Sequence, residues 1–327
     1  MRIVSRHTDL PSTCRGAVVA IGNFDGVHLG HRHVIGEAAR RAAEIGAPLG
    51  VMTFEPHPRS FFNPEGEPFR LTSFETKARR LEALGVDVLY ALPFDAALAG
   101  KDASDFIMDV LVTGIAVLHV VVGEGFRFGR ARSGDTGVLG YSGEMEGFGL
   151  TVVPPFEVEA EGGRRVLSSS VIRRLIAAGR MEEAARFLGA PFVVDGRVAA
   201  GHRRGRTIGF PTANLPLADY QHPAFGVYAV EVEHGAGEPR RLLPGVANVG
   251  VRPTVNGGPE PVVEAHLFEV DEDLYGHSLA VRLLHFLRPE RKFDGLDALK
   301  AQIARDADAA RAWLSDRDNH PQTDEKG

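Results

Sequence analysis

Between residues 16 and 123, short apolar runs alternate with amphipathic helical patterns. Strand-like runs fall at 16–24 and 48–58, a helical pattern lies between them at 30–46, and helix-then-strand patterns follow at 75–94 and 102–123. Gly46 ends the first helical pattern, which begins at Gly30 or His31, and Asp102 or Ser104 can cap the last one. Strands that alternate with helices predict a mostly parallel sheet that binds its ligand at the carboxyl ends of the strands.

The pattern changes in the second half of the chain. Two short helical patterns at 168–179 and 180–189 precede β-type runs, which lie between glycines and prolines at 192–201, 226–235, 241–250, 262–270 and 278–290. This spacing predicts an antiparallel barrel or sandwich. A helical pattern covers 296–316, and the polar end of the chain is expected to be disordered. We therefore expect domains at 1–187 and 188–314 and a tail at 315–327.

Composition and charge exclude several classes of protein. The chain has 327 residues, with 44% hydrophobic and 24% charged residues, as in an ordinary folded domain. A formal net charge of −6 argues against nucleic acid or anionic lipid as a partner, although a local basic cleft could hold a nucleotide.

Cysteine content and hydropathy point to a cytoplasmic protein. Cys14 is the single cysteine, so the chain cannot form an internal disulfide or a cysteine-rich zinc site. An export signal is missing from the first residues, and no apolar run of 18 residues follows them, so we expect no membrane partner. The oligomeric state cannot be read from the sequence.

A glycine-rich turn joins the first strand to the first helix. Glycines at 22, 26 and 30 allow a ligand to approach the backbone, and the amides that begin a helix bind anions. His28 and His31 have a spacing that zinc can use, but no third ligand is evident nearby, so we favour a role as donors to phosphate. An ordinary turn with two exposed histidines is the alternative.

A second glycine-rich segment opens the β-rich half. Gly201, Gly205 and Gly209 can form a phosphate-wrapping loop, and Pro211, Thr212 and Asn214 follow it. Hydroxyl and amide oxygens suit Mg²⁺ that carries nucleotide phosphates, although the segment is not a Walker loop. A plain β-hairpin with an asparagine turn is the alternative.

An ordered series of motifs resembles the bifunctional riboflavin kinase/FAD synthetase family of prokaryotes. The motifs are "GNFDGVHLGH", "TFEPHP", "VVGEGFRFG", "SSSVIR", "GRTIGFPTANL", "GVANVGVRPTV", "EAHLFEV" and "LYGHSLAVRLLHFLRPERKF". They run from about Val18 to Asp306. The resemblance implies a Rossmann-like α/β nucleotidyltransferase domain followed by a mostly antiparallel, riboflavin kinase-like β-barrel with a C-terminal helix.

For the first half, the resemblance implies adenylylation of FMN by ATP, with release of pyrophosphate. His28 and His31 would lie at the triphosphate, and the same motif contributes Gly22, Asn23, Phe24 and Asp25. The serine-rich motif matches Ser168, Ser169, Ser170, Ile172 and Arg173, whose side chains would also bind ATP phosphates. A serine cap on an amphipathic helix is the alternative, and both can hold.

Aromatic and proline residues suggest a surface for the flavin ring. Phe54, Pro56, Pro58, Phe62 and Phe128 can form an apolar wall for the isoalloxazine, although a core position is the more common role for any one phenylalanine. The chain also departs from the family twice. Ser170 replaces the usual threonine and keeps the hydroxyl, whereas Gly125 replaces an Asn or Asp and removes a polar side chain.

For the second half, the resemblance implies phosphorylation of riboflavin by Mg-ATP. Thr212 and Asn214 match the residues that bind Mg-ATP, and Glu264 matches the catalytic base, with Ala265 in place of the usual threonine. Arg252 would line the flavin or phosphate pocket. By itself, Glu264 is also compatible with a solvent-facing strand residue, and Arg252 with a surface turn.

The sequence therefore predicts an enzyme that makes FMN and then FAD, with ATP as co-substrate and Mg²⁺ as cofactor. Two alternatives stay open. The first is a riboflavin kinase whose adenylyltransferase module is weak or altered because of Gly125. The second is a non-catalytic flavin or nucleotide sensor, against which Glu264, His28 and His31 argue.

Overall fold

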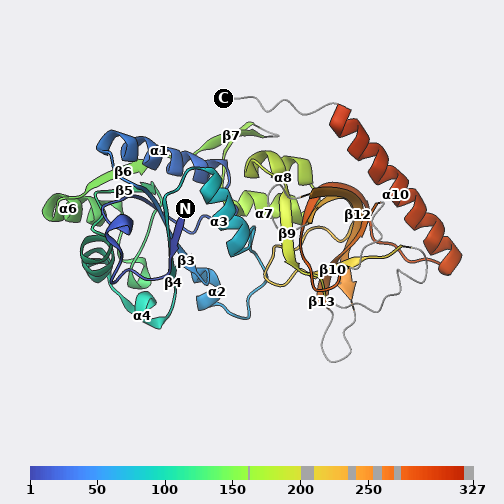
Figure 1. Cartoon of the computed structure of the whole chain (residues 1–327), viewed down its shortest axis with the longest axis horizontal. Helices are drawn as coiled ribbons and strands as arrows, with labels where there is room; N and C mark the ends of the chain where they lie inside the picture. The colour runs from blue at the N-terminus through green and yellow to red at the C-terminus, as the bar shows by residue number, and fades with distance from the viewer. Residues whose placement is uncertain (161–162, 200–209, 235–240, 253–259, 269–273, 320–327) are drawn as a thin grey trace. The chain divides into compact units, whose positions relative to one another are not determined.

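A computed structural model describes residues 1–160, 163–199, 210–234, 241–252, 260–268 and 274–319. The chain forms two compact units (Figure 1). The first unit comprises Met1–Glu67 and Phe74–Ser168, and the second comprises Pro68–Ser73 and Ser169–Gly327.

The first unit contains a six-stranded sheet in the order β1-β4-β3-β2-β5-β6, with every neighbouring pair parallel. The strands are β1 (Arg2–Val4), β2 (Val18–Ile21), β3 (Leu49–Glu55), β4 (Val88–Pro93), β5 (His119–Gly123) and β6 (Gly149–Val153). The helical segments are η1 (Ser12–Cys14), α1 (Leu29–Ile45), α2 (Pro58–Phe62), α3 (Phe74–Ala83), α4 (Ala96–Gly100), α5 (Ala103–Asp105), η2 (Phe106–Ile115), η3 (Arg130–Arg132) and α6 (Thr136–Glu146). A hairpin of β7 (Glu157–Ala160) and β8 (Gly163–Val166) follows.

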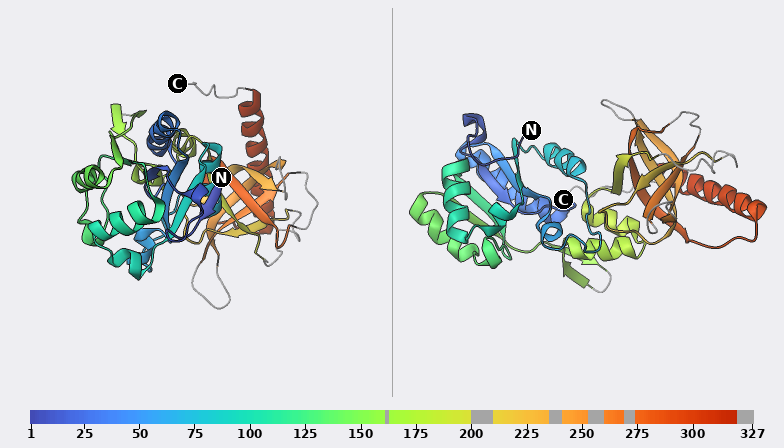
Figure 2. Two further views of the ribbon diagram at one scale, coloured as in Figure 1. Left: turned by 60° about the vertical axis from the view of Figure 1, so that its left-hand side comes forward. Right: turned by 90° about the horizontal axis from the view of Figure 1, so that it is seen from below.

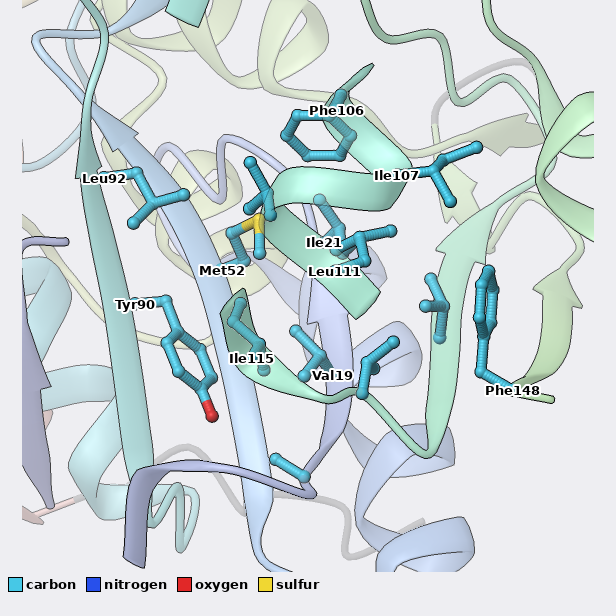
Figure 3. Packing of buried hydrophobic residues seen from close by; sticks show 14 of the residues in the cluster. Val19, Ile21, Met52, Tyr90, Leu92, Phe106, Ile107, Leu111, Ile115 and Phe148 are labelled. Atoms are coloured by element: carbon cyan, nitrogen blue, oxygen red, sulfur yellow. The ribbon is translucent and has the colours of Figure 1, made fainter. Parts of the chain in front are cut away.

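Strand β2 lies at the centre of this sheet and is buried on both faces. Val19 and Ile21 point to one core cluster, and Val18 and Ala20 point to the other. Figure 3 shows the first cluster, in which side chains of η2 pack on those of the central strands. Helices α1 and α3 cover the opposite face. Apolar side chains on both faces are what a parallel sheet requires when helices cover both sides.

The strand order creates a topological switch point at β2. Its neighbours are β3 on one side and β5 on the other, so the connections that follow β2 and β5 diverge. Ligands of open α/β sheets bind where such connections part, beyond the carboxyl ends of the strands. The glycine-rich turn at 22–28 therefore begins at the position in the sheet best suited to a ligand.

The second unit contains a six-stranded antiparallel sheet in the order β10-β13-β12-β11-β14-β9. A bridge between Ala199 and Asn214 connects its two ends and nearly closes a barrel. The strands are β9 (Phe192–Arg197), β10 (Ala213–Pro216), β11 (Gly226–His234), β12 (Arg241–Arg252), β13 (Glu260–Leu267) and β14 (Ser278–Pro289). The helices are α7 (Ser169–Ala177), α8 (Met181–Leu188) and α10 (Leu296–Asn319).

Helix α10 packs on the outside of the barrel (Figure 2). The apolar contact joins helix residues to alternate residues of the strands, namely Ala307, Ala310 and Leu314 with Val227, Ala229, Val246, Phe268 and Leu284. Strand positions alternate between the two faces, so the outer face carries β12 residues 246 and 248 and β13 residues 264 and 266, and Phe268 follows β13 on the same face.

The predicted fold class is confirmed: a parallel α/β domain is followed by an antiparallel barrel with a C-terminal helix. Three local expectations differ from the structure. Helix α1 begins at Leu29 because the side chain of His28 caps it. Helix α10 continues to Asn319, beyond the predicted end at Asp316, where Arg317 pairs with Glu231.

The third difference concerns Asn214, which was expected in a hairpin turn under the alternative interpretation. It lies instead in strand β10, which pairs with β13. Helices α7 and α8 belong to the second compact unit, together with residues 68–73. The domain limits at 187/188 and 314/315 stay a prediction.

Candidate active sites

The turn after β2 has an unusual backbone. Phe24, Gly26 and Val27 have φ values of 48°, 92° and 45°. A positive φ is easy for glycine but costly for an aromatic and especially for a β-branched residue, and such residues gather at functional sites. Phe24 and Val27 are buried, at 2% and 0% exposure, so core packing compensates this strain.

The two histidines lie together at the start of α1. Their rings are stacked, with centroids 3.5 Å apart and planes 18° apart, and Phe24 lies edge-on to His31 at 5.3 Å. His28 Nδ1 accepts a hydrogen bond from the His31 backbone N–H at 3.3 Å. A proton carried by His28 therefore resides on Nε2 in this arrangement. His28 is only 4% exposed, so it is not the exposed turn residue of the alternative interpretation.

Side chains from α1, α3 and β3 fix the carbonyl groups of the turn. Lys77 Nζ and Thr53 Oγ1 donate to the Asn23 carbonyl at 3.1 and 3.0 Å. Arg80 Nη1 donates to the Gly26 carbonyl at 2.8 Å, and Arg32 Nε donates to the Val27 carbonyl at 3.2 Å. Sequence reasoning did not identify these four residues. Lys77 could have been noticed, because it is a charged residue on the apolar face of the α3 pattern.

The residues expected to bind flavin do not form a single group. Phe62 is 69% exposed and makes edge-on contacts with Phe61 and Phe94, and Phe54 also contacts Phe94. Pro56 is exposed and Pro58 begins α2. Pro56, Pro58, Phe61 and Phe62 follow β3, which is next to β2 in the sheet, whereas Phe54 lies in β3 and Phe94 follows β4. Sequence reasoning did not identify Phe61 and Phe94.

Phe128 has a different environment. It is 8% exposed and packs against Phe106 and Phe126, with both ring centroids 5.5 Å away. Phe128 therefore occupies a core position, which was the alternative to a flavin contact in the sequence analysis.

Ser169, Ser170 and Arg173 of the serine-rich motif lie in the first half of α7, in the second compact unit, and Ser168 precedes the helix as the last residue of the first unit. Ser169 is half-buried and Ser170 is exposed. Arg173 Nε donates to the Phe69 carbonyl at 2.7 Å, and its guanidinium lies 5.2 Å from the centre of the Phe69 ring. Ser169, Ser170 and Arg173 therefore belong to the same unit as residues 68–73, and His28 and His31 belong to the other.

Gly125 lies in an exposed turn after β5. An added Cβ would meet no atom within 4 Å, and the φ angle is not in the left-handed region. The backbone therefore does not require glycine at this position.

On the barrel, three polar residues form a row across neighbouring strands. Asn214 of β10 and Asn248 of β12 are both direct register partners of Glu264 on β13. Direct partners project to the same face of a sheet, with Cβ atoms about 5 Å apart. The row places an amide on each side of the predicted base, and Asn248 is a residue that sequence reasoning missed.

Charged neighbours set the electrostatics of Glu264. Burial raises the pKa of its carboxyl above the ordinary value, the Arg252 cation lowers this pKa, and the Glu290 carboxylate raises it further. Glu290 lies beside the row, since its Oε1 accepts a hydrogen bond from Asn248 Nδ2 at 3.4 Å. A carboxyl with a raised pKa is a stronger base when ionised, which suits proton abstraction near neutral pH.

The residues expected to bind Mg²⁺ supply suitable oxygens. Asn214 is 5% exposed, and its Oδ1 is buried without a hydrogen-bond partner among the described residues. Thr212 lies two residues away, just before β10. A buried amide oxygen that lacks a partner fits a hard cation, and Mg²⁺ takes few protein ligands when it carries phosphates. The part of the chain that the structure describes holds no group of three or more His, Cys, Asp or Glu suited to a metal.

Pro211 anchors the start of this segment. Its carbonyl accepts a hydrogen bond from His266 Nδ1 at 2.8 Å, and His266 lies two residues from Glu264 on β13. Gly201, Gly205 and Gly209 lie outside the described residues.

Comparisons with known proteins match both halves of the chain. A family model described as FAD synthetase matches residues 10–170, and one described as riboflavin kinase matches residues 188–314. Proteins named bifunctional riboflavin kinase/FMN adenylyltransferase are similar over nearly the whole length. Those of Escherichia coli K12 and Bacillus subtilis 168 are 45% and 39% identical, each over 91% of this chain and 93% of the relative.

A solved structure is also similar. A crystal structure described as a macrolide-efflux protein from Streptococcus pneumoniae has a TM-score of 0.80 and 32% identity, over 95% of this chain and 98% of that one. Among the described residues, no helix has the length and hydropathy needed to cross a membrane.

Proposed function

The chain belongs to the bifunctional riboflavin kinase/FMN adenylyltransferase family, and on this premise we propose that it makes FAD in two steps. The second unit transfers the γ-phosphoryl group of ATP to riboflavin, giving FMN and ADP. The first unit transfers AMP from another ATP to FMN, giving FAD and pyrophosphate. The observation that carries this proposal is that family models for both activities match separate parts of one chain, at 10–170 and 188–314.

For the kinase, we assign the base to Glu264, which accepts the proton of the terminal ribityl hydroxyl. The raised pKa of Glu264 and its place between Asn214 and Asn248 support this role. Thr212 and Asn214 would hold Mg²⁺, which neutralises charge on the phosphates of ATP. Gly201, Gly205, Gly209 and Pro211 would wrap these phosphates, and Arg252 would line the flavin pocket.

For adenylyl transfer, we assign His28 and His31 to the triphosphate. Their stacking at the N-terminus of α1, after a strained turn at the switch point, supports this role. We also assign ATP binding to Gly22, Asn23, Phe24 and Asp25 of the first unit, and phosphate binding to Ser169, Ser170 and Arg173 of the second. Pro56, Pro58 and Phe62 would contact the flavin, whereas Phe128 packs against Phe106 and Phe126 in the core.

A time course with riboflavin, ATP and Mg²⁺, followed by chromatography of the flavins, tests the proposal. We expect FMN to rise first and FAD to replace it. Glu264→Gln should abolish FMN formation yet still convert supplied FMN to FAD, and His28→Ala with His31→Ala should do the reverse. A folded protein that makes neither flavin would refute both activities.

A second candidate function is a riboflavin kinase with a weak adenylyltransferase. Gly125 favours it, because neither packing nor backbone conformation requires glycine there, so the missing polar side chain is a chemical difference alone. Accumulation of FMN without FAD in the same time course would identify this candidate. We also propose the cytoplasm as the location, since ATP is the co-substrate of both steps, and we propose no nucleic-acid partner.

A further inference from the structure

A fully buried lysine lies beneath the turn that carries the two histidines. Lys77 is 1% exposed and projects from the buried face of α3, next to Ala78 and Leu81. A buried ammonium group is costly unless its protons and its charge both have partners. Fold stability alone seldom requires a charged group on such a face, and a strongly held buried charge near a ligand site is a candidate for function.

The ammonium group of Lys77 contacts acceptors on the turn and on β3. It donates to the Asn23 carbonyl at 3.1 Å, to Thr53 Oγ1 at 3.4 Å and to Glu55 Oε1 at 3.0 Å. Lysine has three protons, and Glu55 balances its charge. Lys77 therefore acts on the backbone of the turn and on the end of β3.

The acceptor at Asn23 determines the direction of the following amide. The only cis peptide among the described residues joins Glu55 to Pro56, so the bond between Asn23 and Phe24 is trans and planar. In a trans peptide the carbonyl and the N–H point in opposite directions. When Lys77 and Thr53 hold the Asn23 carbonyl, the Phe24 N–H points away from them, and the strained φ of Phe24 is maintained.

The same contact joins two parts of the site. Asn23 precedes the histidines, whereas Thr53 and Glu55 end β3, just before Pro56 and α2. We propose that Lys77 is a positioning residue for adenylyl transfer: it fixes the 22–28 turn relative to the end of β3, so that His28 and His31 meet the triphosphate beside the flavin. This role rests on the proposed adenylyltransferase activity of the first unit.

The test compares Lys77→Met with Lys101→Met, which removes a lysine paired with Asp109 elsewhere in the same unit. Transfer of AMP from labelled ATP to supplied FMN is measured in single turnovers with enzyme in excess. Lys77→Met should lower the rate at saturating substrates at least about 30-fold, and Lys101→Met should change it less than about twofold. Riboflavin phosphorylation by the second unit should change less than about twofold in both.

A double variant separates positioning from stability. Glu55→Gln with Lys77→Met removes both charges of the Lys77–Glu55 pair, so its unfolding temperature should recover relative to Lys77→Met alone. A positioning role requires that transfer stays at least about 30-fold slow in this stable variant. Recovery of transfer to within about threefold of the parent would show an ion pair of structural value only and would overturn the proposal.

A double-mutant cycle tests whether Lys77 acts through the histidines. In a His28→Ala background, Lys77→Met should cost less than about threefold in addition, because the group that it positions is gone. The same loss in both backgrounds would contradict the proposal. A folded parent that makes no FAD from supplied FMN would instead refute the proposed adenylyltransferase, and with it this role of Lys77.

Discussion

At the scale of single residues, Glu264 shows how neighbours decide what a carboxyl can do. Its residue type and strand pattern are compatible with an exposed surface position, yet burial raises its pKa, and Arg252 and Glu290 act on it in opposite directions. Neither neighbour is close in sequence. The chemical character of this residue therefore depends on the pairing of β12 with β13 and on the chain that follows β14.

The rate of the kinase should follow the ionisation of Glu264. A base works when ionised, so activity should rise with pH through a pKa above the ordinary value of 4.5. Glu290→Gln removes a like charge and should move this acid limb of kcat/KM to lower pH, by roughly 0.5–1 unit. Arg252→Gln should move it to higher pH. A pH series of initial rates measures both shifts, and Glu144→Gln, at an exposed position of the first unit, is the control. If the acid limb lies at the same pH in all variants, Glu264 is not the base.

Gly125 allows a test of one missing side chain. Because a Cβ there meets no atom within 4 Å, Gly125→Asn should keep the unfolding temperature within about 1–2 °C of the parent. It should raise the rate of FAD formation severalfold if the polar group contributes to transfer. A stable variant with an unchanged rate would show that the glycine is tolerated.

Gly245 is the contrasting glycine for this experiment. A Cβ at Gly245 would lie 2.5 Å from the His266 carbonyl oxygen, so Gly245→Ala should lower stability by about 2 kcal/mol.

At the scale of elements, hydropathy patterns predicted most of what local sequence determines. The central strand β2 is apolar throughout because both of its faces are buried, and α1 ends at Gly46, whose φ of 72° suits glycine. Asp102 caps α5, as one of its two expected caps. Strand β10 was missed because its four residues depend on pairing with β13, and α6 was missed because glycines interrupt its pattern.

The predictability of the site followed the same division. His28, His31, Thr212, Asn214 and Glu264 lie in sequence motifs and could be named in advance. The residues that were not named act through partners far away in the sequence. Lys77 binds Glu55 across 22 residues, Arg80 binds Gly26 across 54, and Asn248 binds Glu290 across 42. Tertiary contacts of that kind leave no periodic signal in a single sequence.

The docking of α10 provides a prediction at this scale. Arg288 makes two hydrogen bonds to the Asp306 carboxylate, at 2.9 and 2.6 Å, and Asp306 is 6% exposed. Asp306→Asn should lower the free energy of unfolding of the second unit by about 2–3 kcal/mol, because it weakens a largely buried charged pair. Asp308→Asn is the matched control on the same helix, where the exposed pair with Arg311 is worth about 0.5 kcal/mol or less. Urea denaturation measures both, and equal losses would show that burial does not strengthen the Arg288 pair.

At the scale of the whole molecule, the order of motifs predicts two modules, but it does not predict which segments each compact unit includes. Residues 68–73 lie within the first half of the sequence and yet belong to the second unit, where Phe69 and Arg70 amides bond to the Asp219 carbonyl and Ser73 bonds to Asp195. Such pairing spans more than 100 residues and depends on the final fold.

The two proposed steps share FMN, so the whole chain allows a complementation experiment. Glu264→Gln lacks the base for the kinase, and His28→Ala with His31→Ala lacks the donors for adenylyl transfer. If FMN leaves the kinase site and enters the other site from solution, an equimolar mixture of the two variants should convert riboflavin to FAD after a lag. The lag should shorten as protein concentration rises, because free FMN must first accumulate to about the KM of the second step.

Chromatography of the flavins measures FMN and FAD together, and each variant alone is the control. If each variant keeps its own activity but the mixture makes FMN without FAD, then FMN does not pass between separate molecules at a useful rate, and the advantage of joining both modules in one chain is the local delivery of this intermediate.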